Sequence, residues 1–374
     1  MMPPTSIRRS PASRTMERKF NPKRLGLARR RRRLTGKDLA TAARISAVTV
    51  SRIENGDNEP DAGTVARLAA ALDYPEGFFF TDDPDELDTT AVSFRSLSKM
   101  SAKERDAAIG AGCLGLQLSD WLEGQFDLPA ANLLDLSHES DPEAAARNLR
   151  AYWGLGEKPI GNMLGLLEVH GVRVFSLSEA TRMVDAFSFW RDSRPFIFLN
   201  NYKTAEHSIY DSAHELGHLV MHRHAGAQPS RAAEREANQF ASAFLMSAND
   251  VRSRLPRFVT VDLIIKAKAR WRVSAMAMAY RLHALGMLTE WQYKSACIEL
   301  GRRGYRTAEP GGIERETSAV WRKVLSHLWG ERTTKREIAA LLHLPPDELE
   351  GLIWGLAGPV VRPERAGARS LRLV

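Results

Sequence analysis

The spacing of apolar residues along the chain predicts a mainly α protein with one short β-rich region. Recurrence every three or four residues, which is typical of amphipathic helices, marks residues 23–71, 101–125, 142–153, 261–300 and 314–357. Three short apolar runs bounded by turn residues lie at 172–177, 186–190 and 195–199. We therefore predict a small antiparallel sheet that precedes a helix around His214.

Shifts in composition divide these elements into domains. Residues 1–20 mix Pro, Ser and Arg without periodicity, which indicates a disordered basic arm. The acidic segment that begins at Thr81 cannot supply a core and is typical of a linker. The predicted order is arm (1–20), all-α bundle (21–80), linker (81–93), α+β domain (94–305) and C-terminal helical segment (313–374). That last segment either packs on the preceding domain or binds a partner.

The positive charge of the chain is concentrated near its N-terminus. The formal net charge is +8, and residues 1–33 alone hold 12 Lys and Arg against the single acid Glu17. Such a basic segment favours nucleic acid as a partner. A membrane surface is the competing interpretation, but no amphipathic apolar face accompanies the arginines. No apolar run reaches the roughly 18 residues of a transmembrane helix either, so we expect no membrane partner.

The cysteines and the N-terminal residues predict a cytoplasmic protein. Cys113 and Cys297 stand far apart without a Cys-x-x-Cys partner, so neither a disulfide framework nor a thiolate metal site is indicated. The arginines of the first 20 residues are not followed by the apolar stretch of a secretion signal. We therefore expect the protein in the reducing cytoplasm.

Two short helices in the N-terminal bundle have the spacing of a helix-turn-helix. Thr35 and Ser46 stand where side-chain oxygens cap successive helices. A steep angle between the helices, which presents the second helix to a DNA major groove, is expected from the apolar residues Leu39, Ala40, Ala43, Ile45, Val50 and Ile53. The second helix offers methyl, hydroxyl and guanidinium groups suited to base edges and phosphates. The candidate DNA-binding residues are Thr35, Ser46, Ala47, Val48, Thr49, Ser51 and Arg52.

This stretch resembles the XRE (Cro-like) family of helix-turn-helix regulators. The family pattern Leu-Thr-x-x-x-Leu-Ala, followed by Ser-x-x-Thr-Val-Ser-Arg-Ile-Glu-Asn-Gly, is met from Leu34 to Gly56. The resemblance implies binding to double-stranded DNA, and we expect a homodimer because such operators are commonly read by dimers. Gly36 departs from the usual phosphate-contacting Gln, and we expect the arginine run 29–33 to replace that contact. A bundle used only for dimerisation or protein binding is the alternative.

A second pattern, at residues 214–218, has the spacing of a zinc site. In His214-Glu215-Leu216-Gly217-His218 the two imidazoles lie one helical turn apart, so both can bind one Zn²⁺ from the same helix face. Glu215 lies beside the metal, where a carboxylate can take a proton from water and deliver it to a leaving amine. Gly217 allows another element to approach closely.

A second helix, which begins near Glu234, offers the third ligand. Glu234 and Asn238 share one face with Ala237 and Ala241, whose small side chains let this helix approach the first. Glu236 points about 160° away from Glu234 on a helix with 100° per residue. We predict Glu234 as the third ligand and Asn238 as a residue that orients a ligand imidazole.

Four further residues near this pattern have candidate roles. His222 and His224 are possible extra ligands, but three protein ligands and a water already complete a catalytic zinc. We therefore prefer a packing or hydrogen-bonding role for His222. Tyr280 and Arg281 are candidate donors to the transition-state oxyanion. A degenerate or purely structural metal site is the alternative to a catalytic one.

This second region resembles the ImmA/IrrE family of zinc metallopeptidases. The resemblance is carried by His-Glu-Leu-Gly-His-x-x-x-His, by Glu-x-x-Ala-Asn-x-Phe-Ala and by Phe244-Leu245-Met246, and it extends from about 92 to 305. Ser247 departs from the Pro that often follows this Met. The family implies a zincin-like fold and peptide-bond hydrolysis, in some members directed at a repressor. A fusion with a preceding XRE domain is a recognisable arrangement.

The two patterns together predict a DNA-binding transcriptional regulator with a zinc endopeptidase domain. We expect that domain to cleave a repressor, or the chain itself, in response to a signal. One alternative is a transcription factor whose zincin-like domain is a non-catalytic sensor or partner-binding module. The other is an antitoxin whose metal domain holds a toxin.

Overall fold

The computed structural model describes residues 19–87, 101–177, 186–224 and 231–358. Most of the predicted arm, the second half of the predicted linker and the last residues of the C-terminal segment lie outside these ranges. The elements, with η1 a 3₁₀ helix, are α1 (Pro22–Arg31), α2 (Gly36–Ala43), α3 (Ala47–Glu54), α4 (Ala62–Leu72), η1 (Glu76–Phe80), α5 (Ala102–Gln125), α6 (Pro142–Tyr152), α7 (Met163–Val169), β1 (Arg173–Leu177), β2 (Ala186–Arg191), β3 (Arg194–Asn200), α8 (Ala205–Met221), α9 (Arg231–Leu245), α10 (Ala248–Arg254), α11 (Val261–Trp271), α12 (Ala275–Ala284), α13 (Glu290–Arg302), α14 (Ala319–Gly330), α15 (Lys335–Leu341) and α16 (Pro346–Ile353). The mainly α fold class is confirmed. No helix within the described ranges is long and apolar enough to cross a bilayer.

The three strands form one sheet in the order β1-β3-β2. β2 pairs antiparallel with β3, while β1 pairs parallel with β3 on its other edge. The prediction of an antiparallel sheet is therefore wrong for β1, because the sheet is mixed. A tight turn at Asp192, with φ of 55°, forces β2 and β3 to run in opposite directions. β1 is separated from β3 by β2 in the chain, so no local turn fixes its direction.

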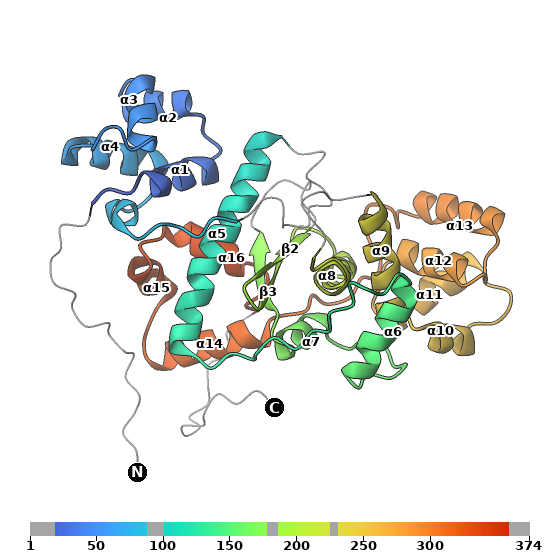
Figure 1. Ribbon diagram of the computed structural model, residues 1–374. Helices are drawn as coiled ribbons and strands as arrows, with labels where there is room; N and C mark the ends of the chain where they lie inside the picture. The colour runs from blue at the N-terminus through green and yellow to red at the C-terminus, as the bar shows by residue number, and fades with distance from the viewer. Residues whose placement is uncertain (1–18, 88–100, 178–185, 225–230, 359–374) are drawn as a thin grey trace, which may run out of the picture.

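The sheet lies between α5 and α8 (Figure 1). Alternation along the strands puts a layer of phenylalanine rings on the α5 face, where Phe187 and Phe198 stack with centroids 4.7 Å apart. Gly115 of α5 lies against this layer, since a Cβ there would be 2.5 Å from Cζ of Phe198. The missing side chain thus lets α5 pack closely on the sheet, and the opposite face is left for α8.

α1 to α4 and η1 form the helical bundle at the upper left of Figure 1. The Thr35 hydroxyl accepts the N–H of Asp38, and the Ser46 hydroxyl accepts the N–H of Thr49, so both predicted caps are confirmed. The apolar positions expected between the two helices are buried at Leu39, Ala40, Ala43, Val50 and Ile53 and half-buried at Ile45. These contacts hold α2 and α3 as one unit.

The C-terminal helix α16 docks this bundle onto the rest of the molecule. Nη2 of Arg31 lies 2.7 Å from Oε2 of Glu348, and both side chains are buried. The Tyr74 hydroxyl donates to the other oxygen of Glu348 at 2.9 Å. Burial and the Glu348 carboxylate hold the pKa of Tyr74 well above its usual value, so the phenol stays a donor. Arg32 adds an ion pair with Asp347 at 2.6 Å.

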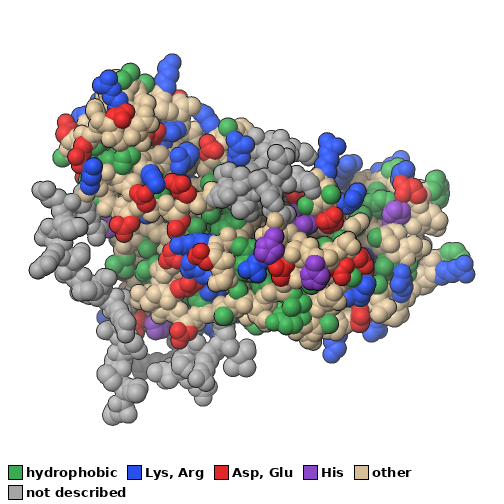
Figure 2. Space-filling view, viewed as in Figure 1, with side chains coloured by type: hydrophobic (Ala, Val, Ile, Leu, Met, Phe, Trp, Pro, Cys, Tyr) green, Lys and Arg blue, Asp and Glu red, His purple; other side chains and the backbone are tan. Residues whose placement is uncertain are grey.

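For three of its five arginines, ion pairs correct the expectation that the run 29–33 binds DNA phosphates. Arg31 and Arg32 face α16, and Arg29 donates two hydrogen bonds to Glu54 of α3 at 2.6 and 3.0 Å. Three of the five charges are therefore neutralised within the protein. Figure 2 shows basic and acidic side chains lying side by side below the bundle. The sequence alone could not show this, because the partners of Arg31 and Arg32 lie more than 300 residues away.

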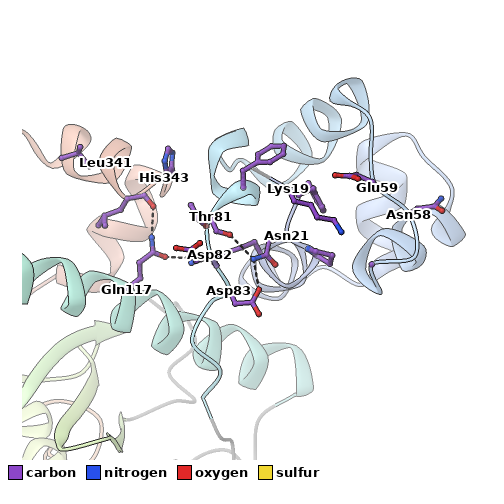
Figure 3. A pocket seen from close by; sticks show the side chains of 16 residues that line it. Lys19, Asn21, Asn58, Glu59, Thr81, Asp82, Asp83, Gln117, Leu341 and His343 are labelled. Atoms are coloured by element: carbon purple, nitrogen blue, oxygen red, sulfur yellow. Dashed lines mark hydrogen bonds between the residues drawn. The ribbon is translucent and has the colours of Figure 1, made fainter. Parts of the chain in front are cut away.

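A second polar contact joins the bundle to α5 and to the end of α15. Gln117 accepts from Nη1 of Arg24 at 2.8 Å and donates to the carbonyl of Leu342 at 2.9 Å (Figure 3). Asn21 donates to Asp83 at 3.0 Å on the other side of the same cavity, which measures about 990 Å³. Gln117 therefore joins the bundle to α5 and α15 on one side of this cavity, and Asn21 binds the segment after η1 on the other.

We expect Glu348→Ala to lower the free energy of unfolding by about 3–5 kcal/mol, because it leaves the buried Arg31 guanidinium without its carboxylate. Glu350→Ala, at an exposed position of the same helix, is the matched control and should change stability by about 0.5 kcal/mol or less. Urea unfolding of the full chain measures both. Equal stability of the two variants would contradict the role assigned to Glu348.

Candidate metal centre and nucleic-acid interface

The two histidines of the predicted metal site lie in the buried half of α8. The helix begins after Thr204, whose hydroxyl accepts the N–H of His207, and every residue from Asp211 to Met221 is buried. His214 and His218 are 1% and 7% exposed. Because they lie one turn apart, both imidazoles face the same neighbouring helix, α9.

α9 packs across α8 at Gly217. A Cβ at Gly217 would lie 3.0 Å from Cδ1 of Phe240 and 3.3 Å from Cα of Ala237. The prediction that Gly217 and Ala237 permit a close approach is therefore confirmed. This approach brings Glu234, one turn before Asn238 on α9, against the two histidines.

The three potential ligand side chains form a triangle, whose corners are the Nε2 atoms of His214 and His218 and the carboxylate group of Glu234. Nε2 of His214 and Nε2 of His218 are 3.1 Å apart. Oε2 of Glu234 lies 3.5 Å from Nε2 of His214, and Oε1 lies 3.4 Å from Nε2 of His218. A tetrahedral zinc with bonds of about 2.1 Å holds its ligand atoms about 3.4 Å apart. The three side chains therefore fit zinc, and they form the one such group of potential ligands within the described residues.

The protonation states of the triangle also suit a metal ion. Burial lowers the pKa of His218 to about 4. Burial alone would raise the pKa of Glu234, but the His214 and His218 imidazoles beside its carboxylate lower it below its ordinary value. At neutral pH this gives a neutral imidazole at His218 and an ionised carboxylate at Glu234, the forms in which these groups bind metals.

Glu215 is fixed by a residue that sequence reasoning missed. The hydroxyl of Ser188 in β2 donates to Oε2 of Glu215 at 2.6 Å, and both residues are buried. Ser188 lies between Phe187 and Phe189, so the pleat turns it away from the phenylalanine layer and toward α8. A single polar residue inside an apolar strand was the available signal, since a buried hydroxyl needs a partner.

The predicted role of Asn238 needs correction. The side-chain amide of Asn238 donates to the backbone carbonyl of Glu234 at 2.8 Å. The backbone carbonyl of Asn238 accepts from the Tyr210 hydroxyl of α8 at 3.0 Å. Asn238 thus ties α9 to α8 and does not orient an imidazole. The i, i+4 spacing that put Asn238 on the same face as Glu234 also lets its amide reach back to the helix carbonyl.

His222 and His224 have hydrogen-bonding roles. Nδ1 of His222 lies 3.1 Å from Nδ1 of His218, on the side of that ring away from the triangle. Nε2 of His224 lies 2.7 Å from Oδ2 of Asp135. His222 therefore forms the hydrogen bonds that the sequence favours for it, and it lies outside the group of three potential ligands.

A cavity of about 670 Å³ opens beside Glu234, between α8, α9 and α12. Tyr280 lines this cavity together with Tyr210 and Ser274, so it stays a candidate oxyanion donor. Arg281 does not, because its guanidinium is buried and donates to Glu143 at 2.6 and 2.7 Å and to the Met246 carbonyl at 2.7 Å. Of the two candidates, only Tyr280 faces the cavity beside the triangle.

α3 carries most of the candidate DNA-binding residues on the outer part of the bundle (Figure 1). Val48 is 61% exposed, and Ala47, Ser51 and Arg52 are also exposed. Thr49 is half-buried with its hydroxyl 2.8 Å from that of Ser46. Thr35 and Ser46 are exposed helix caps. The structure therefore presents an open face at 47, 48, 51 and 52, flanked by the two capping hydroxyls.

Comparison with known protein families assigns both regions. The family model described as Helix-turn-helix matches residues 25–79. The model described as IrrE N-terminal-like domain matches residues 167–283, which include α8, α9 and the triangle. No curated protein matches the chain. The chain therefore joins an XRE-type helix-turn-helix DNA-binding domain to an IrrE-like peptidase domain.

Proposed function

We propose that this protein is a transcriptional regulator whose IrrE-like domain is a zinc endopeptidase. In response to a signal, the domain cleaves a repressor protein or the chain itself. The observation that carries the proposal is the triangle of His214, His218 and Glu234 next to the buried carboxylate of Glu215. A catalytic zinc needs a general base beside it, and a purely structural zinc does not.

The residues of the site divide the chemistry between them. When bound by His214, His218 and Glu234, zinc supplies Lewis acidity, which lowers the pKa of a water and polarises the scissile carbonyl. Glu215, oriented by the Ser188 hydroxyl, takes the proton of the attacking water and delivers it to the leaving amine. The cavity beside Glu234 is large enough to receive substrate side chains.

The helix-turn-helix domain brings this peptidase to DNA. We propose that a homodimer reads two half-sites about 34 Å apart, with α3 of each subunit in a major groove. The contacts of Arg31, Arg32 and Gln117 hold the bundle on the peptidase body. Cleavage would then occur at or near the regulated promoter.

Purified wild-type protein should contain about one zinc per chain, as a site with three protein ligands binds a single ion. His214→Ala and Glu234→Ala should each lose it, because each removes one ligand. Elemental analysis by mass spectrometry measures the content. His224→Ala, which removes an exposed imidazole outside the triangle, is the control and should keep its zinc. Zinc retained in both site variants would place the metal elsewhere.

Glu215→Gln should keep the fold and the zinc but slow cleavage about 10²- to 10⁴-fold, because the amide cannot take the proton from water. Cleavage is measured by mass spectrometry as new protein N-termini in cells that express the wild type or the variant, those of the chain itself included. Identical N-termini and unchanged regulation in the variant would favour the non-catalytic alternatives, a sensor or an antitoxin-like partner-binding domain.

Arg52→Ala should weaken binding to a DNA site selected with the wild-type protein by about 1–3 kcal/mol and relax base preference at one position. The reason is that Arg52 offers an exposed guanidinium on α3. Fluorescence anisotropy at fixed salt measures the affinity. Arg302→Ala, an exposed arginine on α13, is the control and should bind like wild type. Equal affinity of both variants would move the base contacts away from α3.

A further inference from the structure

A chain of hydrogen bonds leads from the triangle to the far side of α9. Nδ1 of His218 lies 3.1 Å from Nδ1 of His222, and Nε2 of His222 lies 3.0 Å from Oε2 of Glu236. His222 is the residue at which α8 ends, and Glu236 lies on α9. Neither of them belongs to the group that can hold a metal ion. His222 therefore contacts a predicted ligand without being one itself, and Glu236 contacts His222.

The order of donors and acceptors along this chain has one solution for neutral imidazoles. A carboxylate has only acceptor atoms, so the hydrogen between His222 and Glu236 belongs to Nε2 of His222. A neutral imidazole carries one N–H, so Nδ1 of His222 is an acceptor. Its partner, Nδ1 of His218, must then be the donor. The remaining nitrogen of His218, Nε2, is left with a lone pair that points at the triangle.

We propose that His222 and Glu236 are positioning residues of the metal centre, which hold His218 in the tautomer whose Nε2 binds the metal. The inference rests on the proposed zinc site and adds the means by which the protein prepares it. A hydrogen bond from Nδ1 also fixes the ring orientation and makes Nε2 a better ligand.

Burial makes this arrangement effective. The side chain of His222 is 14% exposed and His218 is buried, so water competes weakly for the hydrogen bond between these two residues. Glu236, at the outer end of the chain of hydrogen bonds, is 35% exposed. His214 lacks such support, because its Nδ1 is buried with no hydrogen-bond partner among the described residues. Of the two imidazoles, only that of His218 is therefore held at its Nδ1 by a hydrogen bond within the described part of the chain. Glu236 supports this bond from α9, the helix that also supplies Glu234.

The zinc dissociation constant of the full-length protein, measured by competition with a chromophoric chelator, tests the proposal. We expect His222→Phe and Glu236→Ala to bind zinc about 10- to 100-fold more weakly than wild type. His222→Gln keeps a carbonyl that can accept from His218, and it should recover part of the affinity. Gln239→Ala, at an exposed position of α9, is the matched control and should bind like wild type.

The outcomes separate this inference from the proposed function. Unchanged zinc affinity in His222→Phe and Glu236→Ala would overturn the positioning role and leave the zinc site standing. Failure of the wild-type protein to bind zinc would overturn both proposals.

The tautomer of His218 gives a second readout that needs neither zinc nor activity. Long-range ¹H–¹⁵N spectra of metal-free protein labelled at histidine show which ring nitrogen carries the hydrogen. We expect Nδ1–H at His218 and Nε2–H at His222 in the wild type. We also expect His218 to lose its preference for Nδ1–H in His222→Phe. An Nε2–H tautomer of His218 in the wild type would overturn the proposal. This readout needs only the wild-type protein, so it does not depend on whether a variant folds.

Discussion

The close approach of α9 to α8 at Gly217 is the constraint on which the candidate metal centre depends. With 3.3 Å between the Cα of Ala237 and the place where a Cβ of Gly217 would stand, the two helix backbones pack almost without side chains between them. At that separation one carboxylate, Glu234, reaches both imidazoles. A larger residue at 217 would push α9 outward and move Glu234 away from the two imidazoles, which a zinc ion needs at about 3.4 Å from the carboxylate oxygen.

α8 is buried although it carries several polar side chains, and each buried polar group needs a hydrogen-bond partner inside the protein. The partner of Glu215 is Ser188, which the pleat of β2 places on the α8 side of the sheet. The partner of His218 is His222 at the end of α8, which in turn bonds Glu236 of α9. The low-dielectric setting that makes unpaired groups costly also strengthens these hydrogen bonds. Stability and chemistry thus depend on the same contacts.

The DNA-binding bundle is joined to the peptidase body by a region that neither family model covers. α16 lies beyond residue 283, yet its Glu348 accepts from Arg31 and Tyr74 of the bundle. Within the described residues, Arg29, Arg31 and Arg32 of the basic run are therefore paired inside the protein. The candidate DNA-binding residues lie on α3 and at the caps of α2 and α3, on the outer part of the bundle (Figure 1).

Much of the molecule could be predicted from local pattern alone. Helix caps at Thr35 and Ser46, the strand positions, the one-turn spacing of the histidines and the small residues between α8 and α9 all follow from periodicity and chain geometry. These features depend on contacts within a few residues or within one helix face. The parallel pairing of β1, the support of Glu215 by Ser188 and the pairing of Arg31 with Glu348 could not be predicted in this way. Their partners lie up to 317 residues apart, and packing alone decides which distant groups meet.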